Sequence, residues 1–146
     1  IEKDVRRIGY CKNQMKIPDP SKAVISAGTN SFTFQTDVDD DGNVDTLSYY
    51  TGTAAEQTGT PNPRDMMLYR KLNGYQPLAM NIGLTRFDLK YFDINDDSLN
   101  SPVADPTQIN NVEIGIQLES SVPYDTIYSY VAWRQMRMRT RNLTGR

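Results

Sequence analysis

The sequence predicts an α+β fold in which one N-terminal helix precedes a set of antiparallel β-strands. Apolar residues recur at helical spacing over residues 1–16, whereas after residue 23 they alternate with polar residues, as in strands that bury one face. A chain of 146 residues is long enough for one domain with a hydrophobic core and short for two. We therefore expect a single domain over 1–146, with the helix at 1–16 and a β-rich head at 23–146.

Composition excludes several functional classes. The formal net charge is -2 at pH 7, which gives no field that would attract nucleic acid, so a nucleic-acid partner is not expected. The chain has no histidine and so lacks the commonest general base and transition-metal ligand. The sequence also contains no paired nucleophile and base and no glycine-rich phosphate loop. We predict that the protein is not an enzyme.

Residues 1–16 have the pattern of an amphipathic helix. The apolar residues at roughly helical spacing are Ile1, Val5, Ile8 and Met15. Cys11 lies among them and reads as a packing residue, the alternatives being a reactive thiol or an intermolecular disulfide. No capping residue precedes Ile1, so we expect the helix to continue upstream in a longer protein, the alternative being a naturally frayed terminus. Pro18 and Pro20 end the helix.

Short segments with period-two alternation follow the helix. They cover residues 32–35, 47–50, 66–72, 75–80, 87–91, 112–118 and 126–141. Asn73 and Gly74 form a strong hairpin signal, and Pro77 indicates that the strand after it is an edge strand or ends early. Polar loops are expected at 51–64 and 93–108. The alternation indicates an antiparallel sheet with one buried face.

The most specific motif is an acidic loop at residues 37–45, which has five aspartates in nine positions. Its candidate metal ligands are Asp37, Asp39, Asp41, Asn43 and Asp45. The first three have the 1,3,5 spacing of a calcium loop, and Gly42 lies at the sixth position, where the chain turns sharply. Asn43, at the seventh, would offer its backbone carbonyl, and Asp45 lies at the ninth. The twelfth position holds Ser48 in place of the usual bidentate glutamate. We predict a calcium site, the alternative being an acidic β-turn, whereas residues 93–97 read as a solvated loop.

The C-terminal strand is rich in arginine. Its basic residues, with the one that follows it, are Arg134, Arg137, Arg139, Arg141 and Arg146. We interpret this pattern as a solvated arginine face over a core face that contains Met136 and Met138. The alternative is a subunit contact or a track along nucleic-acid phosphates, beside the aromatic residues Tyr128, Tyr130 and Trp133.

Several segments taken in order resemble type IV pilin-like proteins. The matching segments are 1–10, with Asp4, Arg6, Gly9 and Tyr10; 34–50, with the acidic loop; 68–78, with Leu68, Arg70, Asn73, Gly74 and Pro77; 87–93; and 141–143. The first resembles the helix that follows the membrane segment of these proteins, and the last resembles their closing R-N-L. The pattern is most similar to minor pilins of the W type and minor pseudopilins of the J type in type II secretion.

The resemblance implies a long N-terminal helix packed on the sheet, of which 1–16 would be the lower part. It also implies an upstream membrane segment cut by a prepilin peptidase, anchoring in the inner membrane before assembly, and a periplasmic or extracellular head. The expected function is that of a structural minor pilin or pseudopilin, which contacts other pilins or pseudopilins through the helix during filament assembly or at the tip. The alternative is a calcium-dependent extracellular adhesion or carbohydrate-binding module, with Tyr124, Tyr128 and Tyr130 as a sugar platform.

Overall fold

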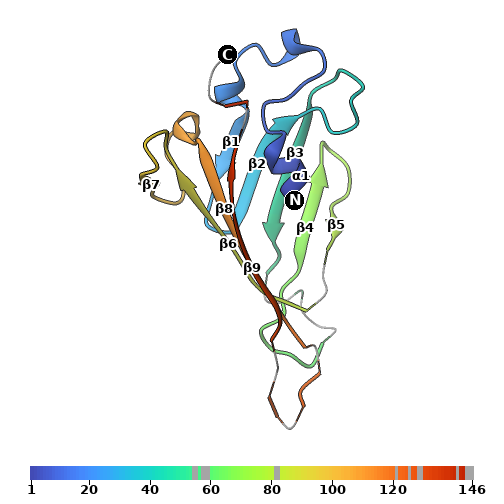
Figure 1. Cartoon of the computed structure of the whole chain (residues 1–146). Helices are drawn as coiled ribbons and strands as arrows, with labels where there is room; N and C mark the ends of the chain where they lie inside the picture. The colour runs from blue at the N-terminus through green and yellow to red at the C-terminus, as the bar shows by residue number, and fades with distance from the viewer. Residues whose placement is uncertain are drawn as a thin grey trace.

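The computed structural model describes residues 1–53, 56, 60–80, 83–120, 122–124, 126, 127, 130–140, 142 and 143. Two antiparallel sheets form the described structure (Figure 1). The first sheet has the order β1-β2-β3-β4-β5, with β1 Val24–Ala27, β2 Ser31–Thr36, β3 Asp45–Thr51, β4 Leu68–Leu72 and β5 Leu78–Ala79. The second has the order β7-β6-β8-β9, with β6 Leu84–Phe92, β7 Ser98–Leu99, β8 Asn111–Glu119 and β9 Tyr130–Arg139.

The expected α+β class, with a helix over 1–16 packed on the sheet, is wrong. The α-helix is α1, Glu2–Arg6, of five residues, and two 3-10 turns follow at η1 Gln14–Lys16 and η2 Pro20–Lys22. Gly9 has a φ of +73°, a left-handed conformation that ends the helical path, and its N–H donates to the carbonyl of Gln35 at 2.9 Å. The chain then runs beside the end of β2, where the Asp37 N–H donates to the carbonyl of Tyr10 at 2.8 Å. The described fold is therefore mostly β, with one short α-helix.

The predicted apolar stripe is buried only in part. Val5, Ile8 and Cys11 lie in the core, whereas Met15 is 88% exposed because η1 turns it away from the sheets. Cys11 is a buried free cysteine, as expected of a packing residue. Within the described residues, no helix has the length and apolar character needed to cross a membrane.

The predicted strands are confirmed in position, but they form two sheets and not one. The two clearest segments pair as β6 with β8 in the register Leu89 opposite Ile114. The strand that follows the Asn73 turn is β5, which has only two residues, as expected of a strand that Pro77 shortens. The loop at 93–108 contains the short strand β7 and a 3-10 turn, η4 Pro106–Gln108.

The core lies between the inner faces of the two sheets. Phe32 of β2 is buried, and its ring centroid lies 5.0 Å from that of Phe34 and 5.4 Å from that of Tyr91 in the opposite sheet. The Tyr91 hydroxyl donates to the carbonyl of Gly28 at 2.8 Å, and burial raises the pKa of this phenol. These aromatic contacts therefore tie one sheet to the other.

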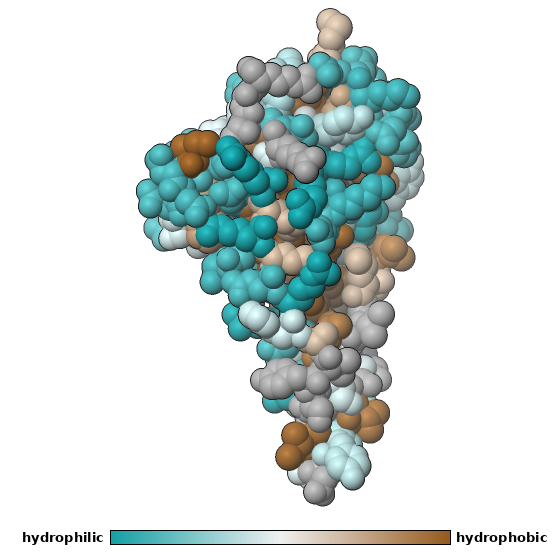
Figure 2. All heavy atoms as spheres, viewed as in Figure 1, coloured by the Kyte–Doolittle hydropathy of each residue, from teal (hydrophilic) through white to brown (hydrophobic). Residues whose placement is uncertain are grey.

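The arginine strand β9 follows the predicted alternation in its last three residues, 137–139. Met138 is buried, whereas Arg137 and Arg139 are exposed. Hydrophilic residues cover much of the upper part of the face shown in Figure 2. Arg137 stacks its guanidinium 3.6 Å from the Phe92 ring centroid and also contacts Asp96. Arg134 pairs with Glu2 at 3.1 Å. Tyr128, Arg141 and Arg146 lie outside the described residues.

Candidate metal centre

The acidic loop joins β2 to β3 and is closed by its own side chains. Asp40 and Gly42 have positive φ angles of 64° and 83°, which reverse the chain. The Asp41 N–H donates to Asp39 Oδ1 at 3.2 Å, an Asx turn of the kind that aspartate favours. Asp45 begins β3 opposite Thr36, the last residue of β2, so the two ends of the loop meet.

Three of the predicted ligands come together at the closed base of this loop. Asp37, Asp39 and Asp45 each place one carboxylate oxygen so that all three atoms lie within 4.8 Å of one another. Like charges about 4 Å apart repel by about 1 kcal/mol in water and about 4 kcal/mol near a protein surface. A divalent cation among these oxygens would turn that repulsion into attraction.

Asp37 is the buried member of the cluster, and its two oxygens differ. Oδ2 accepts the N–H of Lys12 at 3.1 Å and of Gly42 at 3.0 Å, whereas Oδ1 is buried with no hydrogen-bond donor. Burial is the largest single influence and opposes the charged form, but the backbone N–H groups of Lys12, Gly42, Asp40 and Asp41 together outweigh it and hold the pKa of Asp37 below its ordinary value of 3.8. The site thus contains a buried, ionised oxygen that lacks a partner, which is an expensive state without a cation.

Asp41, the remaining predicted carboxylate ligand, is not part of this cluster, whereas the prediction for Asn43 concerns its backbone carbonyl. The backbone N–H and the side-chain amide of Asn43 both donate to Asp41, each at 2.7 Å. The Asn43 side chain is the larger cause of the lowered pKa of Asp41, and the Asn43 backbone N–H adds to it. The Lys16 ammonium donates to the side-chain oxygen of Asn43. Asp41 and Asn43 therefore form a separate hydrogen-bonded pair on the outer side of the loop.

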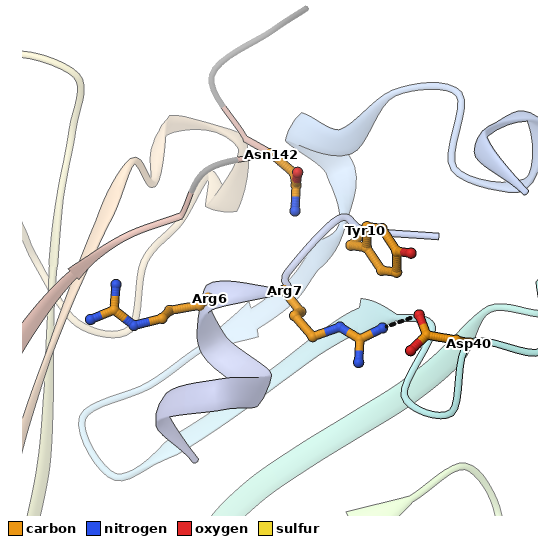
Figure 3. A pocket seen from close by; sticks show the side chains of 5 residues that line it. All are labelled: Arg6, Arg7, Tyr10, Asp40 and Asn142. Atoms are coloured by element: carbon orange, nitrogen blue, oxygen red, sulfur yellow. Dashed lines mark hydrogen bonds and ion pairs between the residues drawn. The ribbon is translucent and has the colours of Figure 1, made fainter. Parts of the chain in front are cut away.

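The sequence reasoning missed Arg7, which holds the loop from the N-terminal segment. Arg7 Nη2 donates to the carbonyl of Asp37 at 2.7 Å and pairs with Asp40 Oδ1 at 2.6 Å. Its guanidinium carbon lies 4.7 Å from the ring centroid of Tyr10. Figure 3 shows Arg7, Tyr10 and Asp40 among the residues that line a shallow pocket, with Asn142 above Arg7 in this view. No spacing in the sequence signals this contact, because about 30 residues separate Arg7 from the loop.

Asn73 is the second residue that the sequence reasoning missed. The sequence predicts a turn at this residue, and Asn73 does occupy the turn after β4, with a φ of 50°. Its side-chain amide also donates to Asp45 Oδ1 at 2.7 Å. The hairpin signal located the turn but gave no sign of the contact with the acidic loop.

In the second acidic segment, at 93–97, the carboxylates of Asp93 and Asp96 accept hydrogen bonds from neighbouring groups. Asp93 Oδ1 accepts the N–H groups of Asn95 at 2.8 Å and of Asp97 at 2.9 Å. Asp96 accepts from Asn111 at 2.9 Å and pairs with Arg137. These contacts agree with the interpretation of the segment as a solvated loop.

Comparison with known proteins adds no relative to these observations. No protein-family model matches the chain, and no curated protein or solved structure matches it either. The function is therefore inferred from the loop, the fold and the sequence resemblance alone.

Proposed function

We propose that this chain is a non-enzymatic structural subunit of a pilin-like filament of the cell envelope, and that its acidic loop binds calcium. The observation that carries the calcium site is the buried Asp37 Oδ1, which lacks a donor beside the carboxylates of Asp39 and Asp45. Calcium accepts carboxylate oxygens in flexible geometry and takes six to eight oxygen ligands, the rest of which water and backbone carbonyls supply. The bound ion would stiffen the β2–β3 connection by removing its internal repulsion.

Calcium is expected to raise the melting temperature of the protein. At a concentration about 100-fold above its dissociation constant, a ligand that binds only the folded state stabilises it by about 2.7 kcal/mol, or about 5–10 °C for a chain of this size. The Asp39→Ala variant should lose this rise, because Asp39 belongs to the cluster. Differential scanning calorimetry with calcium and with a chelator measures the effect.

Asp41→Ala is the matched control for that experiment. Asp41 lies in the same loop but pairs with Asn43 outside the cluster, so its variant should keep most of the calcium response. An unchanged melting temperature of the wild type at millimolar calcium, with no heat of binding by titration calorimetry, would exclude the site. An equal loss in both variants would instead favour the ligand set inferred from the 1,3,5 spacing.

The filament role is supported by the order of the pilin-like segments along the chain. The acidic loop and the segment 68–78, which carry much of the resemblance, fold as two neighbouring turns of one sheet around β3 and β4. The described residues lack the helix packed on the sheet that the resemblance implies, so the proposal rests on the order of these segments and not on the fold. The proposed partners are other pilin-like subunits and, before assembly, the inner membrane.

The full-length protein in its own cells tests this role. An epitope-tagged copy is expected in the inner-membrane fraction and in sheared filaments, and deletion of the gene should lower filament assembly or secretion. A tagged protein found only in a soluble fraction, with unchanged assembly after deletion, would refute the filament role. That outcome leaves the calcium measurements unaffected, since they use the isolated chain.

The sugar-binding alternative has less support. Of the three tyrosines expected to form a platform, Tyr124 is 85% exposed. Tyr128 and the side chain of Tyr130 lie outside the described residues. Of the expected platform, the exposure of Tyr124 is therefore the one feature that the described residues show, so the structural role is preferred.

A further inference from the structure

Asn73 makes three hydrogen bonds to the start of β3. Its backbone N–H donates to the carbonyl of Thr46 at 2.7 Å, and its side-chain oxygen accepts the Thr46 N–H at 2.8 Å. Its side-chain nitrogen donates to Asp45 Oδ1 at 2.7 Å. Leu47 pairs with Leu72 in the register of β3 and β4, so Asn73 continues this ladder with its side chain as well as its backbone.

Asp45 is consequently held at both carboxylate oxygens by groups outside the acid cluster. Oδ1 receives the Asn73 amide, and Oδ2 receives the backbone N–H of Val38 at 2.9 Å. A carboxylate oxygen has two acceptor positions, so each oxygen keeps one for a cation. Without these donors, repulsion from Asp37 and Asp39 would turn the Asp45 side chain toward solvent.

We propose that Asn73 is a positioning residue for the divalent cation, acting through Asp45; this inference rests on the proposed calcium site. Groups that orient a metal ligand by hydrogen bonding commonly account for 10–100-fold in metal affinity. Asn73 supplies this function from the β4–β5 turn. This turn follows the β2–β3 loop by about 30 residues in the sequence, but it lies beside the loop because β4 pairs with β3. Cation binding is thereby coupled to the conformation of a second turn.

The Asn73→Gly variant tests the inference. Glycine adopts the positive φ of this turn without strain, so the change removes the side chain and keeps the backbone path. We expect the dissociation constant for calcium to rise about tenfold by titration calorimetry. Asn95→Gly is the matched control, because Asn95 is an exposed asparagine in the 93–97 loop. This variant should bind calcium with the same affinity as the wild type.

Terbium luminescence supplies a readout that a purely structural role would not change. Terbium is a hard cation that takes oxygen ligands as calcium does, and its excited-state lifetimes in H2O and D2O count the bound waters. If Asn73 orients Asp45, the Asn73→Gly variant should show about one more bound water than the wild type, in place of the lost carboxylate oxygen. Circular dichroism at the same temperature confirms that both proteins are folded.

The possible outcomes separate this inference from the site itself. Wild-type affinity and hydration in Asn73→Gly, together with calcium binding by the wild type, would overturn the role of Asn73 and leave the site standing. Absence of calcium and terbium binding by the wild type would overturn both. A weaker, more hydrated site in Asn73→Gly with an unchanged Asn95→Gly would establish the positioning role.

Discussion

Replacing Asp37 by alanine is expected to destabilise the protein by about 2–4 kcal/mol and to abolish calcium binding. The change leaves the N–H groups of Lys12 and Gly42 without the carboxylate oxygen that now accepts them. A donor left without an acceptor costs about 1–3 kcal/mol when it is buried, and these two part-buried donors lie toward the lower end of that range, at about 1–2 kcal/mol each. Urea unfolding in the presence of a chelator measures this loss without any contribution from bound calcium.

Asp37→Asn separates the charge of this side chain from its hydrogen bonds. The asparagine oxygen can accept the same two N–H groups, while its amide points toward Asp39 and Asp45 and lessens their repulsion. We expect this variant to unfold at a urea concentration close to that of the metal-free wild type and yet to bind no calcium. Loss of stability equal to that of Asp37→Ala would show that the ionised carboxylate is itself required for folding.

Acid provides a second check on Asp37. Because its pKa is lowered in the folded state, Asp37 binds a proton more readily in the unfolded chain, so it contributes stability above its ordinary pKa of 3.8. That contribution is lost as the pH falls from about this value through the lower folded pKa. The Asp37→Asn variant should therefore show a shallower fall in stability with acidification over this range than the metal-free wild type.

The sequence predicted the strands well because their pattern is local. Over residues 87–91 of β6 and 112–114 of β8, buried residues alternate with more exposed ones, and this period-two pattern of an antiparallel sheet with one buried face is visible in the sequence. The helix prediction failed for the opposite reason. Helical periodicity over 1–16 could not show that Gly9 pairs with Gln35, a contact across 26 positions of the chain that outweighs local propensity.

The candidate metal centre was likewise predictable where it depends on local spacing and not where it depends on contacts between separate segments. The spacing of the acids identified Asp37, Asp39 and Asp45 because loop closure by β2 and β3 brings these positions together. Asp41 is not among these three, because its side chain pairs with that of Asn43, a local competition that the calcium-loop pattern does not include. Arg7 and Asn73 could not be predicted, since their contacts with the loop depend on the packing of separate segments.

Phe32→Ala is expected to have the largest effect on stability, about 3–5 kcal/mol. Phe32 is 1% exposed, and its ring contacts Phe34 of its own strand and Tyr91 of the opposite sheet. Truncation removes the buried ring, leaves a cavity between the two sheets and removes the ring contact between Phe32 and Tyr91. Because neither sheet has a second layer described on its outer face, collapse around the cavity would also disturb the hydrogen bond from Tyr91 to Gly28.

The measurement is urea unfolding followed by far-ultraviolet circular dichroism and tyrosine fluorescence. Tyr75→Ala is the matched control, since this aromatic residue is 70% exposed and its loss should change stability by no more than about 0.5 kcal/mol. Coincident transitions from the two probes would show that both sheets unfold together when Phe32 is lost. A cost below about 1 kcal/mol would contradict the packing described between the sheets, because a ring of this size buried at a well-packed junction cannot be removed so cheaply.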